Sequence, residues 1–433
     1  MKIVQLTPGA GGMYCGSCMR DNAMVASLRA LGHDPLLIPL YTPLTTDETD
    51  NSGSRIFFGG LNVFLQQKLA MFRNTPEWID NRLDHPDLLR FATRFGIKTE
   101  PQQLGELTVS MLKGEDGRQS KEVEKLLVFL RDTCKPDIVS LSNVLLTGVA
   151  RRIRNELKVP VVCTLQGEDF FLDGLPEPQR SEAWAILQDR AADFDAVIAV
   201  SNYYGDVMRE RLKLRPERVN VVHNGINLDG YAPAPHRPAE PTVGFLARLA
   251  PEKGLRVLVD AFKILRERIP NAKLRIAGSM TGGDAEFVNE IRKRISDGGM
   301  EKDVTILPNL AREEKIKFLQ SCSVLSVPAA YGESFGLYVL EALACCVPVV
   351  QPDHAAFPEL LQAVGGGILC RPGDPADLAQ KLDELLRNEA RCVELGRAGR
   401  QRVRESYTIE RMSRDVVGVF EKAIAAYKRG AQS

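Results

Sequence analysis

The sequence predicts an α/β protein with two domains, each built on a parallel sheet. Two observations lead to this prediction: short runs of Val, Ile and Leu alternate with longer helical patterns, and a Pro/Ala-rich segment divides the 433 residues near their middle. Strands of a parallel sheet are buried on both faces and therefore read as continuous apolar runs, while helices connect them. A chain of this length has room for two or three domains.

The first half contains apolar runs that we interpret as strands, with helical periodicity between them. Residues 51–135 depart from this alternation, because they hold amphipathic patterns such as Val63–Phe72 and Leu88–Phe95 without clear strands. We expect a helical insertion there, which either shapes a binding pocket or serves packing. The predicted strands are Ile3–Leu6, Leu36–Leu40, Ile138–Leu141, Val159–Leu165, Ala196–Val200 and Val219–Val222.

The domain boundary is predicted in Tyr231–Pro241, because its sequence YAPAPHRPAEP allows neither a helix nor a central strand. The first domain then covers residues 1–237 and the second 238–409. The final stretch Ile409–Lys428 has helical periodicity, and we expect residues 410–433 to return to the first domain. The second domain is predicted to hold a helix at Leu255–Arg268 and strands at Thr242–Phe245, Leu274–Ala277, Val304–Leu307, Val324–Val327 and Val347–Val350.

Charge and composition exclude several classes of protein. The 56 Lys and Arg residues balance 56 Asp and Glu residues, so no net field steers the chain toward nucleic acid or an anionic membrane. No segment has the roughly 18 consecutive apolar residues of a membrane span, and the first residues lack the apolar core of a secretory signal, so a cytoplasmic location is expected. The nine cysteines are scattered, which predicts reduced thiols.

Glycines follow the first predicted strand in the segment Pro8–Gly12. Gly11 and Gly12 let backbone amides approach an anion, and the following helix offers its positive end, so a phosphate contact is predicted. A tight turn without a ligand is the alternative. The third glycine of a dinucleotide-binding fingerprint is replaced by Tyr14 and no P-loop motif occurs, so a Rossmann dehydrogenase and a P-loop ATPase are disfavoured.

Two cations lie in the corresponding loop of the second half, residues 244–254, with the sequence GFLARLAPEKG. Arg248 offers a planar fork and Lys253 a point charge, and both suit the oxygens of one diphosphate. Together they can stabilise negative charge on a departing diphosphate without a metal ion. The alternative is that both are solvated surface residues, as most lysines and arginines are.

Two glutamates lie within the segment Tyr331–Leu343, YGESFGLYVLEAL. If a helix begins near Ser334, Glu341 lies about two turns along it, roughly 12 Å beyond Glu333, which matches the length of a sugar diphosphate. Carboxylates accept hydrogen bonds from paired hydroxyls, so Glu341 suits a ribose and Glu333 a hexose. A capped amphipathic helix with exposed glutamates is the alternative, but it leaves the apolar start unexplained. The amides predicted to face the phosphates are those of Phe335, Gly336 and Leu337.

The glycine-rich first loop, GFLARLAPEKG at 244–254, IAG at 276–278 and GESFGLYVLEAL at 332–343 together resemble retaining glycosyltransferases of family 4. The resemblance covers the second half closely and the first half by architecture. It implies the GT-B fold, in which two facing Rossmann-like domains bind a nucleotide-sugar donor mainly through the C-terminal domain, with the N-terminal domain on the acceptor side. It also implies that the nucleotide diphosphate sugar is a co-substrate and that no further cofactor or metal is needed.

The resemblance implies roles for the matching residues. Gly11 and Gly12 are expected near the donor phosphates, and Arg248 and Lys253 on the diphosphate. Glu333 is expected on the sugar. The predicted catalytic residues are accordingly Arg248, Lys253 and Glu333, and the predicted donor-binding residues are Gly11, Gly12, Phe335, Gly336, Leu337 and, on the ribose, Glu341.

The sequence departs from the family pattern at Gln166, where many members have a His close to the donor sugar. Glutamine can hydrogen-bond a hydroxyl but cannot take a proton. Retention in this family is thought to use front-face attack, in which the donor phosphate accepts the acceptor's proton, so the change is expected to tune specificity more than to abolish turnover. Gln166, Glu168 and Asp169 are candidate sugar contacts, and no general base is assigned.

Three further motifs have competing interpretations. Asp193-Phe194-Asp195 matches a metal-binding D-x-D, but it directly precedes a buried-type run, so no metal site is predicted. The C-x-x-C of Cys15 and Cys18 lies where redox proteins place such a pair, and packing of small residues beside the loop is the alternative that we favour. A basic cluster could face a lipid surface, but we expect it to be a solvated helix face; its members are Arg151, Arg152, Arg154 and Lys158.

The sequence therefore predicts a metal-independent retaining hexosyltransferase that moves a hexose from a nucleotide diphosphate sugar to a hydroxyl of a glycan, polysaccharide or lipid-linked acceptor. Its expected context is polysaccharide biosynthesis, with at most peripheral membrane association and no nucleic-acid partner. Two alternatives stay open. One is a nucleotide-sugar epimerase on the same fold, with His223 as a candidate base near a strand end, and the other is a redox-responsive binding protein that uses Cys15 and Cys18.

Overall fold

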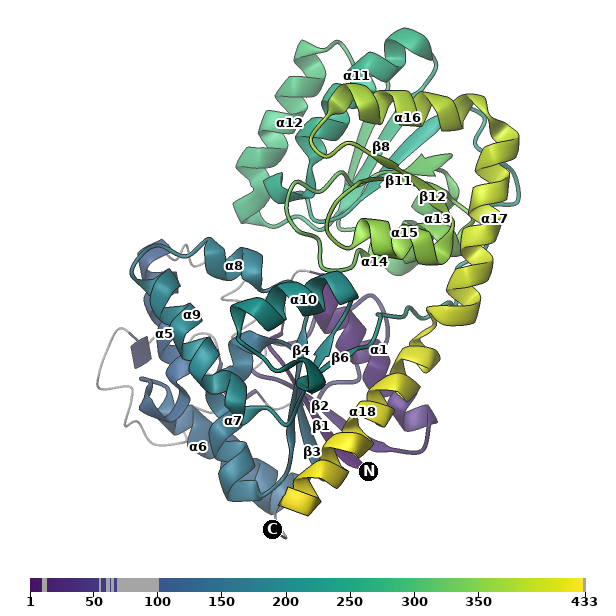
Figure 1. Cartoon of the computed structure of the whole chain (residues 1–433). Helices are drawn as coiled ribbons and strands as arrows, with labels where there is room; N and C mark the ends of the chain where they lie inside the picture. The colour runs from purple at the N-terminus through teal and green to yellow at the C-terminus, as the bar shows by residue number, and fades with distance from the viewer. Residues whose placement is uncertain (10–13, 54–55, 60–62, 64–65, 68–100, 431–433) are drawn as a thin grey trace. The chain divides into compact units, whose positions relative to one another are not determined.

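The computed structural model of the chain describes residues 1–9, 14–53, 56–59, 63, 66–67 and 101–430. The chain divides into two compact units (Figure 1), of which unit 1 is Met1–His223 with Met412–Ser433 and unit 2 is Asn224–Arg411. Each unit contains one parallel sheet of six strands flanked by helices. The prediction of two α/β domains with parallel sheets is confirmed.

Unit 1 has the strand order β2-β1-β3-β4-β5-β6. Its strands are β1 (Lys2–Thr7), β2 (Asp34–Pro39), β3 (Ile138–Leu141), β4 (Val161–Leu165), β5 (Ala196–Ala199) and β6 (Val219–Val221). Its helices are α1 (Gly16–Ala30), α5 (Pro101–Lys113), α6 (Ser120–Phe129), α7 (Ala150–Arg152), α8 (Asp169–Asp173), α9 (Gln179–Arg190) and α10 (Asn202–Arg211). Short 3-10 or π turns occupy Gly114–Asp116, Leu130–Cys134, Val144–Val149, Ile153–Leu157, Ala191–Asp193 and Pro216–Arg218.

Unit 2 has the strand order β12-β11-β10-β7-β8-β9. Its strands are β7 (Thr242–Leu246), β8 (Lys273–Gly278), β9 (Val304–Pro308), β10 (Val324–Leu325), β11 (Val349–Pro352) and β12 (Gly367–Cys370). Its helices are α11 (Leu255–Arg268), α12 (Ala285–Asp297), α13 (Arg312–Gln320), α14 (Leu337–Ala344), α15 (Phe357–Val364), α16 (Pro375–Arg387) and α17 (Glu389–Ser406), with 3-10 turns at Pro251–Lys253 and Gly282–Asp284.

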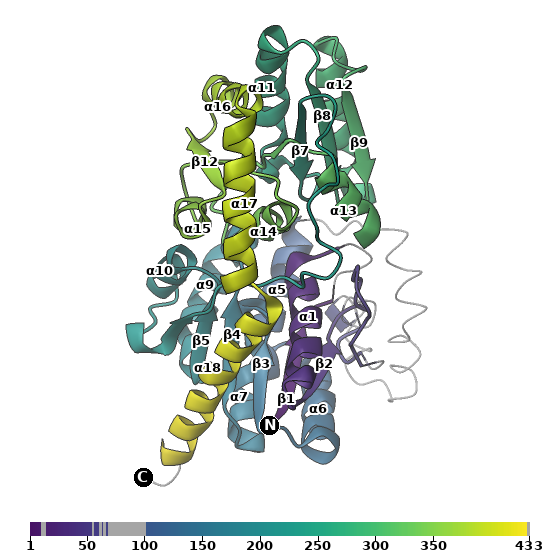
Figure 2. The ribbon, with the colours of Figure 1, turned by 90° about the vertical axis from the view of Figure 1, so that its right-hand side faces the viewer.

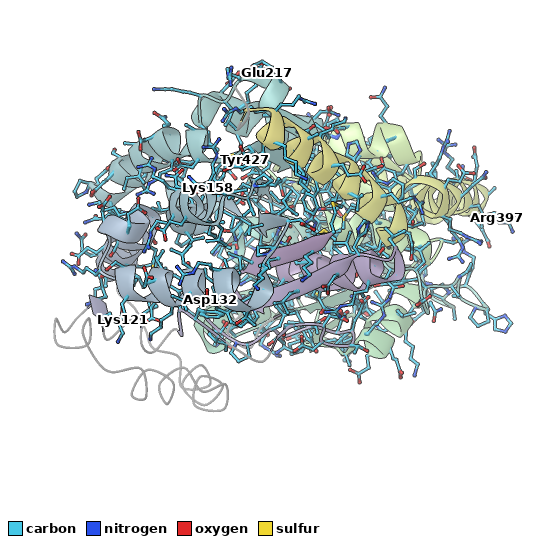
Figure 3. All side chains as sticks on the ribbon, turned by 90° about the horizontal axis from the view of Figure 1, so that it is seen from below. Lys121, Asp132, Lys158, Glu217, Arg397 and Tyr427 are labelled. Atoms are coloured by element: carbon cyan, nitrogen blue, oxygen red, sulfur yellow. The ribbon has the colours of Figure 1, made fainter. Side chains whose placement is uncertain are left out.

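The last helix, α18 (Ile409–Gly430), follows α17 in the chain (Figure 2), and from Met412 onward it belongs to unit 1. The hydroxyl of Tyr427, labelled in Figure 3, donates a hydrogen bond of 3.1 Å to the carbonyl oxygen of Arg154 in unit 1. The C-terminal helix therefore returns to the N-terminal domain, as predicted.

The central strands form the core of each sheet. Every residue of β4 and β7 is buried, whereas β6 and β9 at the sheet edges are partly exposed. Burying a side chain such as that of Phe245 contributes about 1.5–3 kcal/mol to stability. The continuous apolar runs of the sequence thus correspond to strands buried on both faces.

Differences from the predicted elements have local causes. Strand β12 has no counterpart among the predicted strands, because it is four residues long, follows Gly365 and Gly366, and lies at the sheet edge with only Cys370 buried. Strand β10 ends at Leu325 rather than Val327. Of the predicted insertion 51–135, the described residues from 101 onward are mainly helical, while most of the patterns at 63–72 and 88–95 lies outside the described residues.

The segment Tyr231–Pro241 contains neither helix nor strand and belongs to unit 2. The chain passes between the units twice, near Ile226 and near Tyr407–Ile409, and these two segments are hydrogen-bonded to each other. The N–H of Ile226 donates to the carbonyl of Tyr407, and the N–H of Ile409 donates to the carbonyl of Ile226. The two compact units divide after His223, whereas the sequence predicts that the first domain ends at residue 237. Among the helices in the described ranges, none combines the length and apolar character that a membrane crossing requires.

Candidate active site

The predicted site residues of unit 2 follow strands β7 and β10, and the loop after β8 lies beside the loop after β7. In the sheet, β7 lies between β10 and β8. Because the strands are parallel, the loops that follow these three strands leave the same edge as neighbours. Ligands of open α/β sheets bind beyond this carboxyl edge. The strand order therefore brings the cations of residues 248–253 toward both the glutamate motif after β10 and the loop after β8.

Two glycines allow these loops to approach closely. Gly254 has φ +76°, and a Cβ there would lie 1.7 Å from the carbonyl oxygen of Pro328. At Gly278 a Cβ would lie 1.6 Å from the carbonyl oxygen of Ala247. Any larger residue would therefore push the loop after β7 away from its two neighbours. The conformation of residues 247–254 depends on both glycines.

Lys253 and Glu333 form an ion pair in the site. Lys253 Nζ lies 2.9 Å from Glu333 Oε2, donates a hydrogen bond to the Tyr331 hydroxyl, and sits 4.7 Å from the centre of the Tyr331 ring. The hydroxyl of Tyr338 donates to the same Glu333 oxygen at 3.0 Å. Burial raises the pKa of Glu333, but the Lys253 cation and these hydrogen bonds outweigh it and leave the pKa below its usual value. Glu333 is thus held as a carboxylate.

Arg248 is the more exposed cation of the site. Its side chain is 43% exposed, and its Nη2 donates to Asp284 Oδ1 at 2.8 Å. Burial raises the pKa of Asp284, but hydrogen bonds from Thr281 and Arg248 lower it by more, so the pKa lies below its usual value. Within the described part of the chain, the other N–H groups of Arg248 have no hydrogen-bond partner. They are available to an anion.

Glu341 is held on one oxygen only. Lys315 Nζ lies 2.7 Å and the Tyr231 hydroxyl 2.8 Å from Glu341 Oε1. Burial and the neighbouring Glu341 charge raise the pKa of Tyr231, so this phenol stays a donor. The carboxylate is 16% exposed, and no hydrogen bond from the described residues reaches its Oε2. Glu341 is therefore a positioned acceptor with one oxygen open to a ligand hydroxyl.

Helix α14 begins later than the sequence suggested. Its first residue is Leu337, preceded by Gly336 with φ +92°, rather than a residue near Ser334. Glu341 therefore lies four residues beyond the first residue of the helix, about 6 Å along its axis. The helix start near Ser334, on which the predicted spacing of roughly 12 Å depends, is wrong. The N–H groups of Gly336 and Leu337 donate no hydrogen bond within the described residues. The Phe335 side chain is buried and its ring centre lies 6.4 Å from that of Tyr407.

The candidate sugar contacts of unit 1 follow β4. Glu168 is buried, and its carboxylate accepts the backbone N–H groups of Gln166 and Gly167, both at 2.9 Å, and of Val144 at 3.3 Å. The Tyr204 hydroxyl lies 3.0 Å from Glu168 and 2.9 Å from Asp169. Burial raises the pKa of Glu168 in spite of these hydrogen bonds. Glu168 therefore fixes the loop around it.

Gln166 points its carboxamide toward β3. Its Nε2 donates to the carbonyl oxygen of Ser142 at 2.7 Å. Glu168 and Gln166 are thus both bound to protein groups, and Asp169 shares the Tyr204 hydroxyl with Glu168. Gly11 and Gly12 lie outside the described residues.

The D-x-D segment and the basic cluster neutralise each other. Asp193 pairs with Arg151 at 3.1 Å, and Asp195 pairs with Arg154 at 3.2 Å while also accepting the N–H of Val161. Arg152 pairs with carboxylates of its own helix region and of α6. Both aspartates are therefore structural, and the three arginines are not an unpaired cationic patch.

Several residues that hold the site were not among the residues predicted from the sequence. Tyr331 and Tyr338 flank the glutamate motif and would have been found by asking which neighbours can donate to a buried carboxylate. Asp284, Lys315 and Tyr231 come from distant segments, and only the fold brings them to Arg248 and Glu341.

Two parallel-sheet units, the second with cations and carboxylates at its carboxyl edge, define a protein of the GT-B class. Residues 232–402 match the family model described as glycosyl transferases group 1, and residues 111–229 match the one described as glycosyltransferase family 4. The chain belongs to the glycosyltransferases of family 4, and the resemblance seen in its sequence is confirmed.

Solved structures agree with this fold. Sucrose-phosphate synthase from Thermosynechococcus elongatus superposes with a TM-score of 0.73 at 18% identity, over 98% of this chain and 99% of that chain. HepE of Anabaena in complex with UDP and glucose superposes with a TM-score of 0.67 at 17% identity, over 97% of this chain and 99% of that chain. At such identities these likenesses establish the fold.

Curated relatives match over part of their length. D-inositol 3-phosphate glycosyltransferase of Mycobacterium sp. (strain KMS) is 29% identical over 180 residues, 40% of this chain and 40% of the relative. Phosphatidyl-myo-inositol mannosyltransferase of Mycobacterium leprae is 33% identical over 205 residues, 46% of this chain and 52% of the relative. The chain thus matches about half or less of the length of these two relatives.

Proposed function

We propose that this protein is a retaining hexosyltransferase that moves a hexose from a nucleotide diphosphate sugar to an acceptor hydroxyl. The observation that carries the proposal is the set of charged side chains at the carboxyl edge of unit 2, where Arg248 and Lys253 lie on the loop after β7 and Glu333 and Glu341 follow β10. HepE, which shares the fold, was crystallised with UDP and glucose, which supports a nucleotide-sugar donor.

The two cations suit the diphosphate of the donor. Cleavage of the bond between sugar and phosphate leaves a negative charge on the nucleoside diphosphate. The open N–H groups of Arg248 and the third N–H of Lys253, beyond those given to Glu333 and Tyr331, are donors for this charge. Preorganised donors of this kind are each worth about 2.7–4 kcal/mol of barrier.

The two carboxylates suit the hydroxyl groups at either end of the diphosphate. Glu341 Oε2 is open to the hydroxyls of a ribose, and Glu333 is kept ionised next to Lys253 for the hydroxyls of the sugar. The N–H groups of Gly336 and Leu337 at the start of α14 lie in sequence between these carboxylates and suit phosphate oxygens.

The proposed transfer step depends on which group can take the proton of the acceptor hydroxyl. Gln166 cannot take a proton, and Glu168 is committed to backbone N–H groups. We therefore propose that the acceptor hydroxyl attacks the anomeric carbon on the face that the leaving phosphate vacates, and that an oxygen of this phosphate takes the proton. The configuration at the anomeric carbon is then retained.

Arg248 and Lys253 take the role that a divalent cation has in other sugar transferases, so the proposal includes no resident metal. Full turnover in the presence of a chelator such as EDTA is expected, measured as release of nucleoside diphosphate. Loss of turnover with EDTA, restored by Mg²⁺ or Mn²⁺, would contradict this part of the proposal.

The acceptor is proposed as a hydroxyl of a glycan, a polysaccharide or a lipid-linked molecule, with polysaccharide biosynthesis in the cytoplasm as the context. The family also includes proteins named for transfer to inositol phosphate and to phosphatidylinositol, which carry ring hydroxyls. The ion pairs of Arg151, Arg152 and Arg154 leave little reason to place a lipid surface on that helix region.

The test is a proton NMR experiment on the full chain with nucleotide sugars and a panel of sugar and polyol acceptors. The expected result is a new glycoside with the anomeric configuration of the donor, together with free nucleoside diphosphate. A change of configuration at a ring carbon of the donor or its product, without transfer, would indicate the epimerase alternative, which the family membership does not favour. Product of inverted anomeric configuration would also contradict the proposal.

A further inference from the structure

Cys15 and Cys18 lie at the start of helix α1 in unit 1. Cys15 is the residue before the helix, with an extended backbone, and its carbonyl accepts the N–H of Met19 at 2.9 Å. Cys18 is the third residue of the helix. Side chains at these two positions face each other, as in a capping box. Cys18 is close enough to Cys15 to be the largest influence on the pKa of the Cys15 thiol.

The two thiols have different surroundings. Cys15 is partly exposed, and Gly16 next to it is exposed. Cys18 is fully buried in a cluster with Val25, Leu37 and Leu44. Cys15 is therefore the outer residue of the pair, partly exposed although it packs against the same cluster, and Cys18 is the inner, buried one.

Neighbouring groups lower the pKa of Cys15 and raise that of Cys18, so the pair carries its proton on Cys18. The hydrogen bond from Cys18 is the largest cause that lowers the pKa of Cys15, from 9.0 to about 6; burial opposes it, and Ser17, whose Oγ lies 3.1 Å from the Cys15 sulfur, adds to it. The hydrogen bond to Cys15, burial and the Cys15 charge raise the pKa of Cys18, the buried Asp21 raises it further, and the Thr7 hydroxyl at 3.7 Å opposes them. The positive end of α1 also favours a thiolate at Cys15.

We propose that Cys15 and Cys18 form a redox-active dithiol that exchanges with low-molecular-weight disulfides. The Cys15 thiolate attacks one sulfur of the disulfide R–S–S–R, forms a mixed disulfide and releases one thiolate RS⁻. Cys18 then loses its proton and attacks the Cys15 sulfur, which releases the second RS⁻. The two thiolates leave as RSH after protonation, so the protein dithiol is oxidised by two electrons and R–S–S–R is reduced to two RSH. This exchange goes beyond the proposed function, because it involves no nucleotide sugar.

Metal binding is the other common use of such a pair, and the surroundings do not support it. Within the described ranges, no three His, Cys, Asp or Glu side chains are close enough to one another to hold a metal ion. Another partly exposed cysteine provides a comparison for the reactivity of Cys15. Cys134 is partly exposed like Cys15, but burial raises the pKa of its thiol, so it serves as a matched internal control.

The first experiment measures alkylation by iodoacetamide at pH 6, followed by mass spectrometry of the peptides that carry Cys15 and Cys134. A thiol with a pKa of about 6 is expected to react about twentyfold faster at this pH than one with an ordinary pKa, after allowing for its lower nucleophilicity. Cys18→Ala is expected to reduce this advantage, because it removes the hydrogen bond to the Cys15 sulfur. Equal rates at Cys15 and Cys134 in the native chain would overturn the proposal.

The second experiment equilibrates the full chain with reduced and oxidised glutathione, traps free thiols with N-ethylmaleimide and digests the protein. The expected peptide joins Cys15 to Cys18 and has lost two hydrogens. Cys18→Ser is expected to retain glutathione on Cys15, and Cys15→Ser is expected to form neither product. If both thiols of the wild-type chain stay reduced in oxidised glutathione alone, or if Cys15→Ser reacts like the wild type, the proposal is wrong. The wild-type result decides even where a variant fails to fold.

Discussion

Carboxylates follow central strands in both units of this protein, but they are held in opposite ways. Glu168, after β4 of unit 1, is surrounded by backbone N–H groups that use both of its oxygens. Glu341, beyond β10 of unit 2, is held on one oxygen by Lys315 and Tyr231 and keeps the other open. A carboxylate that backbone amides surround organises a loop, whereas one held from one side by side chains is available to a ligand.

The same contrast applies to the cations. Arg151 and Arg154 of unit 1 are each bound to aspartates of the D-x-D segment. Arg248 of unit 2 has one carboxylate partner and N–H groups left over. Unit 2 therefore has charged side chains that can still form hydrogen bonds with a ligand, whereas those of unit 1 are paired within the protein. Substitutions can test this difference.

The largest effect is expected from Arg248→Ala. Loss of a donor to the departing diphosphate should lower kcat by about 10²–10³-fold. Arg248 is 43% exposed, and the buried Asp284 keeps its hydrogen bonds from Thr281, so the free energy of unfolding should change by about 1 kcal/mol. Steady-state kinetics and urea denaturation measure the two quantities.

The matched control for Arg248→Ala is Arg256→Ala. Arg256 is 42% exposed and forms an ion pair with Glu290, which is not among the predicted site residues. It should leave kcat unchanged. Equal losses of kcat in the two variants would mean that Arg248 acts as an ordinary surface residue.

Glu168→Ala is expected to affect stability rather than ligand binding. The buried N–H of Val144 and the partly buried N–H groups of Gln166 and Gly167 would lose their acceptor, which should lower the free energy of unfolding by about 3 kcal/mol. Urea denaturation followed by circular dichroism measures this loss. A loss below about 1 kcal/mol would show that the loop does not depend on this carboxylate.

Glu341→Ala is expected to weaken nucleotide binding about tenfold, which is about 1.4 kcal/mol, because the ribose loses an acceptor. The fold should stay intact, since the proposed partner of Glu341 Oε2 is a ligand and not a core group. Isothermal titration with the nucleoside diphosphate measures the affinity. Unchanged affinity in a folded variant would remove Glu341 from the donor site.

The smallest effect is a difference in pH dependence. The pKa of Glu333 is below its unfolded value, so its contribution to stability is present above about pH 4.5 and is lost as the pH falls through the folded pKa. The pKa of Glu168 is above its unfolded value, so its contribution is present below about pH 4.5 and is lost as the pH rises through the folded pKa.

The pH dependence is measured as melting temperature for Glu333→Gln and Glu168→Gln against the wild type. Glu333→Gln should melt with less sensitivity to acid below about pH 4.5. Glu168→Gln should lose less stability than the wild type as the pH rises above that value. Parallel curves for all three proteins would contradict the assigned pKa directions.

The sequence predicted the sheets well because buried parallel strands leave continuous apolar runs, as in β4 and β7. It also predicted the charged residues of the unit 2 site, because Arg248, Lys253 and the glutamates lie in short contiguous motifs. The start of α14 was predicted too early because Gly336 takes a left-handed conformation that delays the helix. The edge strand β12 was missed because only Cys370 of its residues is buried.

The partners of the site residues could not be predicted, since they depend on which strands are neighbours. Lys315 and Tyr231 are 26 and 110 residues away from Glu341 in the sequence. The order β10-β7-β8 decides that Lys253 meets Glu333 and that Arg248 meets Asp284. Glu168 was proposed as a sugar contact because the sequence does not show that backbone N–H groups use its oxygens.

The most direct test of the central claim, that unit 2 binds a nucleotide-sugar donor through the charged side chains at its carboxyl edge, is the melting temperature in the presence of UDP-, GDP-, ADP- and dTDP-sugars. A ligand at a hundred times its Kd adds about 2.7 kcal/mol to stability. We predict that the nucleotide sugars of one base raise the melting temperature of the wild type, and that the shift is smaller in Glu341→Ala. No shift with any nucleotide sugar in the folded wild type, or an equal shift in the variant, would contradict the claim.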